Sequence, residues 1–347
     1  MSTITITPSK APVLLQDALR AGLVPMLVSS PGLGKSTIAR KIASDKNLKV
    51  IDLRLSQCDP TDLGGFPMIN NERTKASYVP MNTFPIEGDE IPLNEKGKHY
   101  NGWLLLMDEF NSAPPSVQAA AYKIVLDKEV GLHKLHKDVH IICAGNLATD
   151  RAIVNRMSTA MQSRLIHFEM EPDLSDWMAW AGKENIDHRI MSFVAFRPEL
   201  LHYFSPDHAD KTFPCPRTWE FLSRIVSPWS DIPADKMAIV AGTIGEGTAM
   251  EFTSFCQIYG RIPTIENILA APKTVQWDAE PSIMYAMSGL IAKHITETNV
   301  DTLMQAMERL PLEFQIYSLK GAIIRNSALT TTPSVDAWIS RNAKDLM

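Results

Sequence analysis

Residues 29–36 read SSPGLGKS, directly after an apolar stretch at residues 24–28 and directly before a run with helical character, TIARKIA. This order of strand, glycine-rich loop and helix is the context that a phosphate-binding loop requires. The run fits the pattern G-x-x-x-x-G-K-[ST] except at its first position, which is Ser29 here. Because the phosphate contacts come from the residues after that position, the departure weakens the pattern only slightly.

The glycines and the two residues after them suit a phosphate group. Gly32 and Gly34 let the backbone turn, so that successive N–H groups and the helix N-terminus face an anion. Lys35 would reach the β and γ phosphates, and Ser36 would ligate Mg²⁺. The alternative is a plain Gly-Pro turn between a strand and a helix. The predicted nucleotide contacts of this loop are Pro31, Gly32, Leu33, Gly34, Lys35, Ser36 and Thr37.

A second run, WLLLMDEF at residues 103–110, supplies what a lone phosphate-binding loop lacks. Its continuous apolar part predicts a central strand buried on both faces. At the strand end, Asp108 would hold Mg²⁺ through its water shell, and Glu109 would orient and deprotonate an attacking water. The acidic pair favours a hydrolysing ATPase over a P-loop kinase. Read alone, it could also be an acidic strand end exposed to solvent.

Composition limits the class of protein. The chain has 347 residues, enough for two or three domains, with 45% hydrophobic and 21% charged residues. Its formal charge of −5 provides no global basic field for nucleic acid or for an anionic membrane. We therefore expect a cytoplasmic protein with no membrane partner. The widely spaced cysteines favour reduced thiols: Cys58, Cys143, Cys215 and Cys256.

The first half of the chain alternates short apolar runs with helical periodicities. This alternation predicts an α/β fold with a five-stranded parallel sheet. The predicted strands lie at residues 24–28, 49–55, 103–107, 139–144 and 165–170. A polar, proline-rich stretch at about residues 64–101 exceeds the usual loop length, which favours an inserted functional element over a disordered surface loop.

The second half has apolar residues at three- and four-residue spacing and predicts helices only. They are expected at residues 174–181, 189–196, 218–226, 243–259, 281–295, 300–310 and 312–324. We predict three domains: an α/β nucleotide-binding core at residues 1–171, an α-helical lid at 172–262 and an α-helical C-terminal region at 263–347.

Three polar residues lie where a nucleotide-hydrolysing enzyme needs them. Asn146 ends the fourth predicted strand, at the sheet edge where ligands of open α/β folds lie; a strand-end turn is the alternative. Arg164 lies between a short helix and the last strand and could reach a neighbouring subunit's nucleotide, although alone it also fits a surface charge. Arg217 begins a helix, where a cation is electrostatically unfavourable, so a ligand or partner is expected there.

Together these motifs resemble the AAA+ ATPases, and more closely their MoxR-like, dynein-related branch. SSPGLGKS is similar to the Walker A motif, LLLMDE to Walker B and AGN to the sensor-1 strand. SRL resembles the arginine-finger segment, with Leu165 in place of phenylalanine, and CPRTW resembles the sensor-2 segment. The runs RLSQCDPTDLGGFP and DEFNSAPPSVQAA resemble that branch specifically. The resemblance covers about residues 10–260.

The resemblance implies a role for each matched residue. Lys35 and Ser36 bind phosphate and Mg²⁺, Asp108 and Glu109 carry out hydrolysis, and Asn146 senses the γ-phosphate. Arg217 acts within its own subunit, whereas Arg164 acts on a neighbour, with Arg156 as its rival. A trans arginine requires a homo-oligomer, usually a ring of six. In the insert at residues 64–101, the candidate substrate contacts are Tyr78, Val79 and Met81.

The function that this resemblance implies is ATP-driven, chaperone-like remodelling, assembly or activation of a protein client, with a von Willebrand A-type protein as one candidate. The alternative is a nucleic-acid-associated motor or a restriction or defence component. The acidic charge and the absence of a zinc, helix-turn-helix or aromatic-basic signature argue against nucleic acid. A third hypothesis is a scaffold that binds ATP without hydrolysing it. It is the least favoured of the three, because Asp108 and Glu109 are both present.

Overall fold

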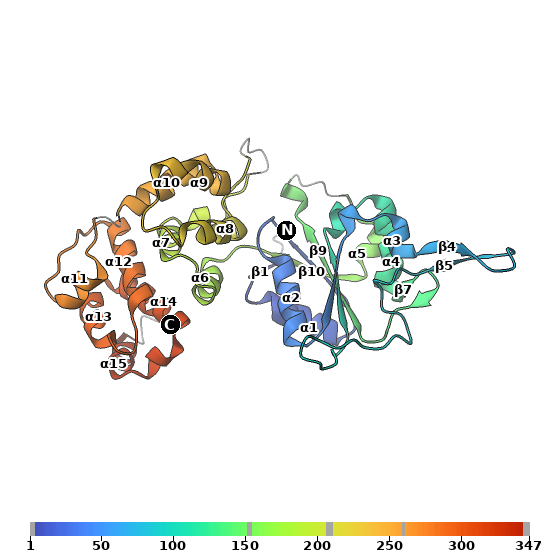
Figure 1. The fold of residues 1–347 in the computed structure, drawn as a ribbon, viewed down its shortest axis with the longest axis horizontal. Helices are drawn as coiled ribbons and strands as arrows, with labels where there is room; N and C mark the ends of the chain where they lie inside the picture. The colour runs from blue at the N-terminus through green and yellow to red at the C-terminus, as the bar shows by residue number, and fades with distance from the viewer. Residues whose placement is uncertain (1–3, 151–154, 206–210, 259–260, 343–347) are drawn as a thin grey trace. The chain divides into compact units, whose positions relative to one another are not determined.

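The computed structural model describes residues 4–150, 155–205, 211–258 and 261–342. The chain forms two compact units, Met1–Glu171 and Pro172–Met347. Figure 1 shows a sheet with helices in the first unit and helices in the second. The predicted α/β P-loop core followed by an α-helical region is confirmed.

The first unit is built on a six-stranded sheet in the order β1-β10-β2-β9-β6-β3, and every pairing in it is parallel. The strands are β1 (Thr5–Ile6), β2 (Val24–Ser29), β3 (Lys49–Arg54), β6 (Trp103–Asp108), β9 (Val139–Asn146) and β10 (Leu165–Met170). The five predicted strands are all present. The sixth strand of this sheet, β1, was missed, because two residues are too short for a periodic signal.

Each face of this sheet has its own hydrophobic core. Along β6, Leu105 and Met107 pack into one cluster with the helix α4 (Pro115–Asp127), whereas Leu104 and Leu106 pack into another. The second cluster includes residues of α1 (Ala11–Arg20) and α2 (Lys35–Asp45). A strand covered on both faces needs apolar residues at every position, which explains the unbroken run before Asp108.

The insert between β3 and β6 contains secondary structure of its own. After α3 (Pro60–Gly64), the strands β4 (Phe66–Ile69) and β5 (Ala76–Val79) form an antiparallel hairpin, which extends away from the sheet in Figure 1. Gly65 adopts a φ of +86°, and a Cβ there would lie 2.4 Å from the Val79 carbonyl oxygen. A glycine is therefore required where the two strands of the hairpin meet.

Isolated bridges order the rest of the insert. Ile86 pairs with Leu135 outside the insert, whereas Leu93 pairs with His99 within it. A second small hairpin, β7 (Glu129–Val130) and β8 (His133–Lys134), follows α4. Its turn residue Gly131 has a φ of +59°, and a Cβ there would lie 2.8 Å from the Gly64 carbonyl oxygen. The small hairpin thus contacts the base of the larger one.

The second unit is helical throughout the part of it that the structure describes. Its helices are α6 (Leu174–Lys183), α7 (His188–Phe196), α8 (Pro216–Val226), α9 (Met237–Ile244), α10 (Glu246–Gln257), α11 (Ile265–Ala270), α12 (Pro281–His294), α13 (Val300–Met307), α14 (Leu312–Arg325) and α15 (Pro333–Asn342). The helix predicted at residues 243–259 is present as α10, but its predicted start is wrong. Gly245, with φ 84° and ψ 153°, ends α9 and starts α10, because this conformation cannot continue a helix.

One hydrophobic core runs through the helical unit. It includes residues from the predicted lid, such as Trp219 and Phe252, and residues from the predicted C-terminal region, such as Ile283 and Trp338. The contacts thus group both regions in one unit. The finer division at residue 262 stays a prediction.

Candidate functional site

The loop between β2 and α2 has the backbone of an anion-binding turn. Gly32 and Gly34 adopt φ values of +83° and +84°, in the left-handed region that glycine occupies without strain. Gly34 is the N-cap of α2, and its position leaves room for a Cβ, so conformation and not space demands the glycine there. The first N–H groups of α2 have no partner within the helix and form a partial positive charge at this turn.

Lys35 is held across the loop by neutral oxygen atoms. Its ammonium group donates to the Ser29 carbonyl oxygen at 3.0 Å, to the Ser29 hydroxyl at 3.1 Å and to Asn146 Oδ1 at 3.2 Å. Ser29, the departure from the usual motif, is fully buried and serves as a polar contact for the lysine. The Ser30 carbonyl oxygen also accepts from it, at 3.4 Å. An anionic phosphate is a stronger acceptor than these neutral groups. Lys35 is therefore placed to exchange neutral partners for a charged one.

Ser36 and Asp108 meet although 72 positions separate them. The Ser36 hydroxyl donates to Asp108 Oδ2 at 2.6 Å, while Asp108 Oδ1 accepts the backbone N–H of Glu109 at 2.8 Å. No group of three or more acidic, histidine or cysteine side chains suited to a metal occurs among the residues described. One hydroxyl and one carboxylate still fit Mg²⁺, which takes one or two protein oxygens and completes its shell with water and substrate phosphates.

Glu109 has an unusual backbone for a non-glycine residue. Its φ is +54° and its ψ is +33°, at the point where β6 gives way to a short 3₁₀ turn, Phe110–Ser112. Non-glycine residues in this region are uncommon and occur often at functional sites. The Glu109 carboxylate accepts a hydrogen bond from the Ser56 hydroxyl, in the 3₁₀ turn Leu55–Gln57 that follows β3. The carboxylate is thus directed toward the neighbouring strand's end.

Asn111, which the sequence patterns did not single out, fixes the backbone of Asn146. Its side-chain amide donates to the Asn146 carbonyl oxygen at 2.7 Å and accepts from the Asn146 backbone N–H at 3.0 Å. Asn111 is 6% exposed. A Cβ on Gly145 would lie 2.4 Å from Asn111 Oδ1, so the preceding glycine is needed for this close approach. The position of Asn111, two residues after the acidic pair Asp108-Glu109, could have identified it from the sequence.

The sheet topology explains why these residues converge. In a parallel sheet all carboxyl ends lie at one edge, and β9 lies directly between β2 and β6. Asn146, at the end of β9, is therefore between the phosphate-binding loop and the acidic pair. The structure brings together five predicted residues: Lys35, Ser36, Asp108, Glu109 and Asn146.

Arg164 and Arg156 are exposed and lie outside this group of contacts. The Arg164 guanidinium donates to the Ala160 carbonyl oxygen at 2.7 Å and lies 5.5 Å from the centre of the Tyr122 ring. Its carbonyl contact caps the short helix α5 (Thr159–Gln162). Neither contact is a buried structural bond. The trans role of either arginine stays a prediction.

Arg217 lies in the helical unit, at the second position of α8, and it is exposed. Its neighbours fix the helix start tightly: the Thr218 hydroxyl accepts the Cys215 backbone N–H at 2.8 Å, and Trp219 is fully buried. The arginine is thus presented by a well-anchored helix turn. Its predicted action on the nucleotide stays a prediction.

The predicted substrate contacts differ in their exposure. Tyr78 and Val79 lie on β5 and are 50% and 48% exposed. Met81 instead packs against the core of the first unit. The hairpin exposes further apolar side chains that the sequence did not single out, namely Phe66, Met68 and Ile69.

No protein-family model and no curated protein matches the sequence. Among solved structures, the chain is similar to a candidate ATPase of Cytophaga hutchinsonii, at 14% identity, 98% coverage of this chain, 90% of that chain and a TM-score of 0.38. It is also similar to two variants of RuvB from Thermotoga maritima, both at 14% identity. They cover 96% and 94% of this chain and 86% and 88% of theirs, with TM-scores of 0.39 and 0.38. At these values we draw no functional conclusion from the similarity.

Within the described ranges, no helix is both long and apolar enough to cross a bilayer.

Proposed function

We propose that this chain is an AAA+ type ATPase that binds Mg-ATP and hydrolyses it to ADP and phosphate. The observation that carries the proposal is the hydrogen bond from Ser36, on the phosphate-binding loop, to Asp108, at the end of the buried strand β6. It joins the two motifs that the chemistry needs in one place. Around this bond, Lys35 supplies a positive charge for phosphate, Glu109 a general base and Asn146 a polar amide.

Each side chain has a role set by its position. The N–H groups after Gly32 would cradle the phosphates, and Lys35 would leave its neutral acceptors for the negative phosphate oxygens. Ser36 and Asp108 would hold Mg²⁺. When bound, this ion neutralises charge that develops on the phosphate oxygens. Asn146 would contact the outermost phosphate; its Oδ1 lies 3.2 Å from the Lys35 ammonium nitrogen, which supports this role.

Glu109 is the proposed general base. It would accept a proton from the attacking water, which requires its carboxylate to face the phosphates. Its hydrogen bond with Ser56 holds the carboxylate toward the end of β3 instead. A rotation of this side chain would therefore precede hydrolysis.

We further propose that the enzyme works on a protein client as a homo-oligomer of the MoxR-like type, with six subunits as the expected number. Exposed cations at Arg156 and Arg164 support a contribution to a neighbour's site. The hairpin β4–β5 supports a client contact, since it presents five exposed apolar side chains. Such a patch favours protein partners. A von Willebrand A-type client rests on the sequence resemblance alone.

ATP titration and turnover measurements on two variants test the proposed activity. Lys35→Ala should abolish ATP binding, because it removes the loop's charged side chain. Lys41→Ala, on the exposed face of the same helix, is the matched control and should bind as the wild type does. Glu109→Gln should bind ATP and hydrolyse it about 100-fold more slowly. Undiminished affinity in Lys35→Ala, or wild-type turnover in Glu109→Gln, would refute the assignment.

A further inference from the structure

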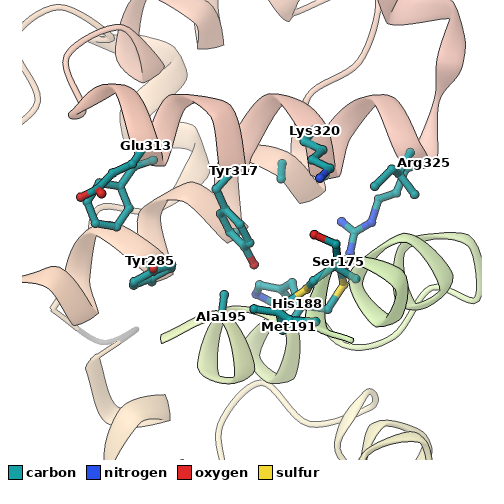
Figure 2. Close-up of a pocket in the computed structure, with 16 residues that line it drawn as sticks. Ser175, His188, Met191, Ala195, Tyr285, Glu313, Tyr317, Lys320 and Arg325 are labelled. Atoms are coloured by element: carbon teal, nitrogen blue, oxygen red, sulfur yellow. Dashed lines mark hydrogen bonds between the residues drawn. The ribbon is translucent and has the colours of Figure 1, made fainter. Parts of the chain in front are cut away.

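A cavity of about 200 Å³ lies inside the helical unit, between α6, α7, α12 and α14 (Figure 2). Much of its wall is apolar, from Met178, Met191, Phe314 and Ile324. Ser175 and Lys320 also line it and are exposed, which places them at its opening. The motifs of the nucleotide site account for none of these residues.

Close contacts between helices frame the cavity. A Cβ on Gly289 of α12 would lie 2.0 Å from the Ser192 hydroxyl of α7, and a Cβ on Gly182 of α6 would lie 2.6 Å from Ile324 of α14. Both glycines therefore let neighbouring helices approach more closely than a side chain would allow. The cavity is the space left between backbones that are already in contact, so it is formed before any ligand arrives.

Arg325 lies at one end of the cavity, and no carboxylate among the described residues forms an ion pair with it. Its Nε is buried and has no hydrogen-bond partner, and its Nη2 contacts the Met191 sulfur at 3.5 Å, a weak acceptor. Burial lowers the pKa of Arg325, and the charge of Asp187 partly offsets this shift. Both oxygens of Asp187 nevertheless accept hydrogen bonds from Arg189, at 3.0 Å and 2.8 Å. Arg325 as a whole is half-buried, and unused donors on a half-buried guanidinium are costly unless an acceptor reaches them.

The other polar groups along the wall leave that charge uncompensated. Glu313 also lines the cavity, but twelve helical positions separate it from Arg325, about 18 Å along α14, and Figure 2 shows the two at opposite ends. Burial lowers the pKa of His188, which keeps its imidazole neutral near pH 7. Burial raises the pKa of Tyr317, so that phenol also stays neutral. The cavity therefore has a cationic end and an apolar body.

Size sets the class of ligand. An engineered apolar cavity of about 150 Å³ holds one benzene ring, and this cavity is slightly larger at about 200 Å³. It therefore has room for a single ring, or a short aliphatic chain, that carries one small polar group. The fork of an arginine guanidinium matches the two oxygens of a carboxylate.

We propose that this cavity is a binding site for a small monocarboxylate with an apolar body, whose carboxylate pairs with Arg325 and whose ring or chain lies between Met191 and Tyr317. The site belongs to the helical unit, and its existence does not depend on ATP hydrolysis.

Ligand-observed NMR titrations of the full chain test this with benzoate, and with benzyl alcohol as a neutral probe of similar size. We expect benzoate to bind about 10-fold more tightly than benzyl alcohol, the scale of one hydrogen bond to a charged group. Arg325→Met should remove this preference and leave benzyl alcohol affinity within about threefold. Arg224→Met, an exposed arginine on α8 paired with Glu220, is the matched control and should behave as the wild type does.

Ser175→Phe gives a second, independent test, because Ser175 is exposed and its replacement would obstruct the opening without disturbing the core. Both probes should then bind at least about 10-fold more weakly. The proposal is overturned if benzoate does not bind the wild type, if it binds no better than benzyl alcohol, or if folded Ser175→Phe retains its affinity. Lys35→Ala protein should bind benzoate normally, so loss of nucleotide binding leaves this result unchanged.

Discussion

The Ser56 hydroxyl donates a hydrogen bond to the carboxylate of Glu109, the residue proposed as the general base. Two loops that follow adjacent strands, β3 and β6, make this contact. Glu109 is held there in a left-handed backbone conformation, while its own N–H is bound to Asp108. In this arrangement a protein hydroxyl engages the carboxylate of the proposed base.

Removing that hydroxyl should release the base. We expect Ser56→Ala to raise basal ATP turnover about 2- to 10-fold, because a net hydrogen bond of about 0.5–1.5 kcal/mol no longer opposes rotation of Glu109. Ser56→Thr keeps a hydroxyl and should turn over at the wild-type rate. Steady-state phosphate release measures both. Equal or slower turnover in Ser56→Ala would show that the contact does not restrain the base.

Asn111 should act through Asn146 and not through substrate. Asn111→Ala removes the two hydrogen bonds that fix the backbone of Asn146, one to its carbonyl oxygen and one from its N–H. Because Asn146 would then be less firmly positioned, we expect kcat to fall about 10-fold, on the scale of the net free energy of these bonds. The dissociation constant for ATP should change less than about threefold, because the phosphate-binding loop is untouched. Asn155→Ala, which loses its side-chain contact to the Ala113 carbonyl oxygen, is the control. A large loss of ATP affinity would indicate a general structural defect instead.

A trans arginine can be separated from a local one by mixing inactive subunits. If Arg164 completes a neighbour's site, Arg164→Ala combined with Lys35→Ala should recover part of the wild-type turnover, since one intact half-site of each kind can pair. The same mixture with Arg156→Ala tests its rival. ATPase activity at varied ratios is the readout. Recovery with neither variant would favour a cis or local role, such as the contact of Arg164 with Ala160.

The buried imidazole of His188 should make stability depend on pH. Burial lowers its folded-state pKa below the ordinary 6.5, even though Asp187 opposes this shift. As the pH falls, His188 therefore takes up a proton in the unfolded state before it does so in the folded state. The free energy of unfolding is then highest above pH 6.5 and decreases below it.

Urea unfolding followed by circular dichroism tests this dependence. Between pH 7 and pH 5, His188→Gln should lose about 1–2 kcal/mol less of its free energy of unfolding than the wild type does. Parallel curves for the two proteins would contradict a neutral, buried His188. Since carboxylates begin to titrate below this range, the comparison stops at pH 5.

The sequence alone determined five strands of the main sheet, most helices of the second unit and most of the candidate site. Glycines at 32 and 34 before Lys35, and an unbroken apolar run before Asp108, are local patterns with local physical causes, namely backbone conformation and burial on both faces. From them the parallel sheet, its five longer strands and the contents of the nucleotide site could be predicted. The break at Gly245 was missed, because the apolar spacing continues on both sides of it.

Tertiary structure decided the relationships that span long stretches of chain. Ser56 and Glu109 are 53 positions apart, and Asn111 and Asn146 are 35 apart. The order of the strands in the sheet brings these pairs together. The spacing of apolar residues along the sequence does not predict contacts between residues so far apart in the chain. The same holds for the Arg325 cavity, since it depends on how closely four helices approach at their glycines. Local sequence determines conformation and burial, whereas pairing across the fold depends on the packing of the whole chain.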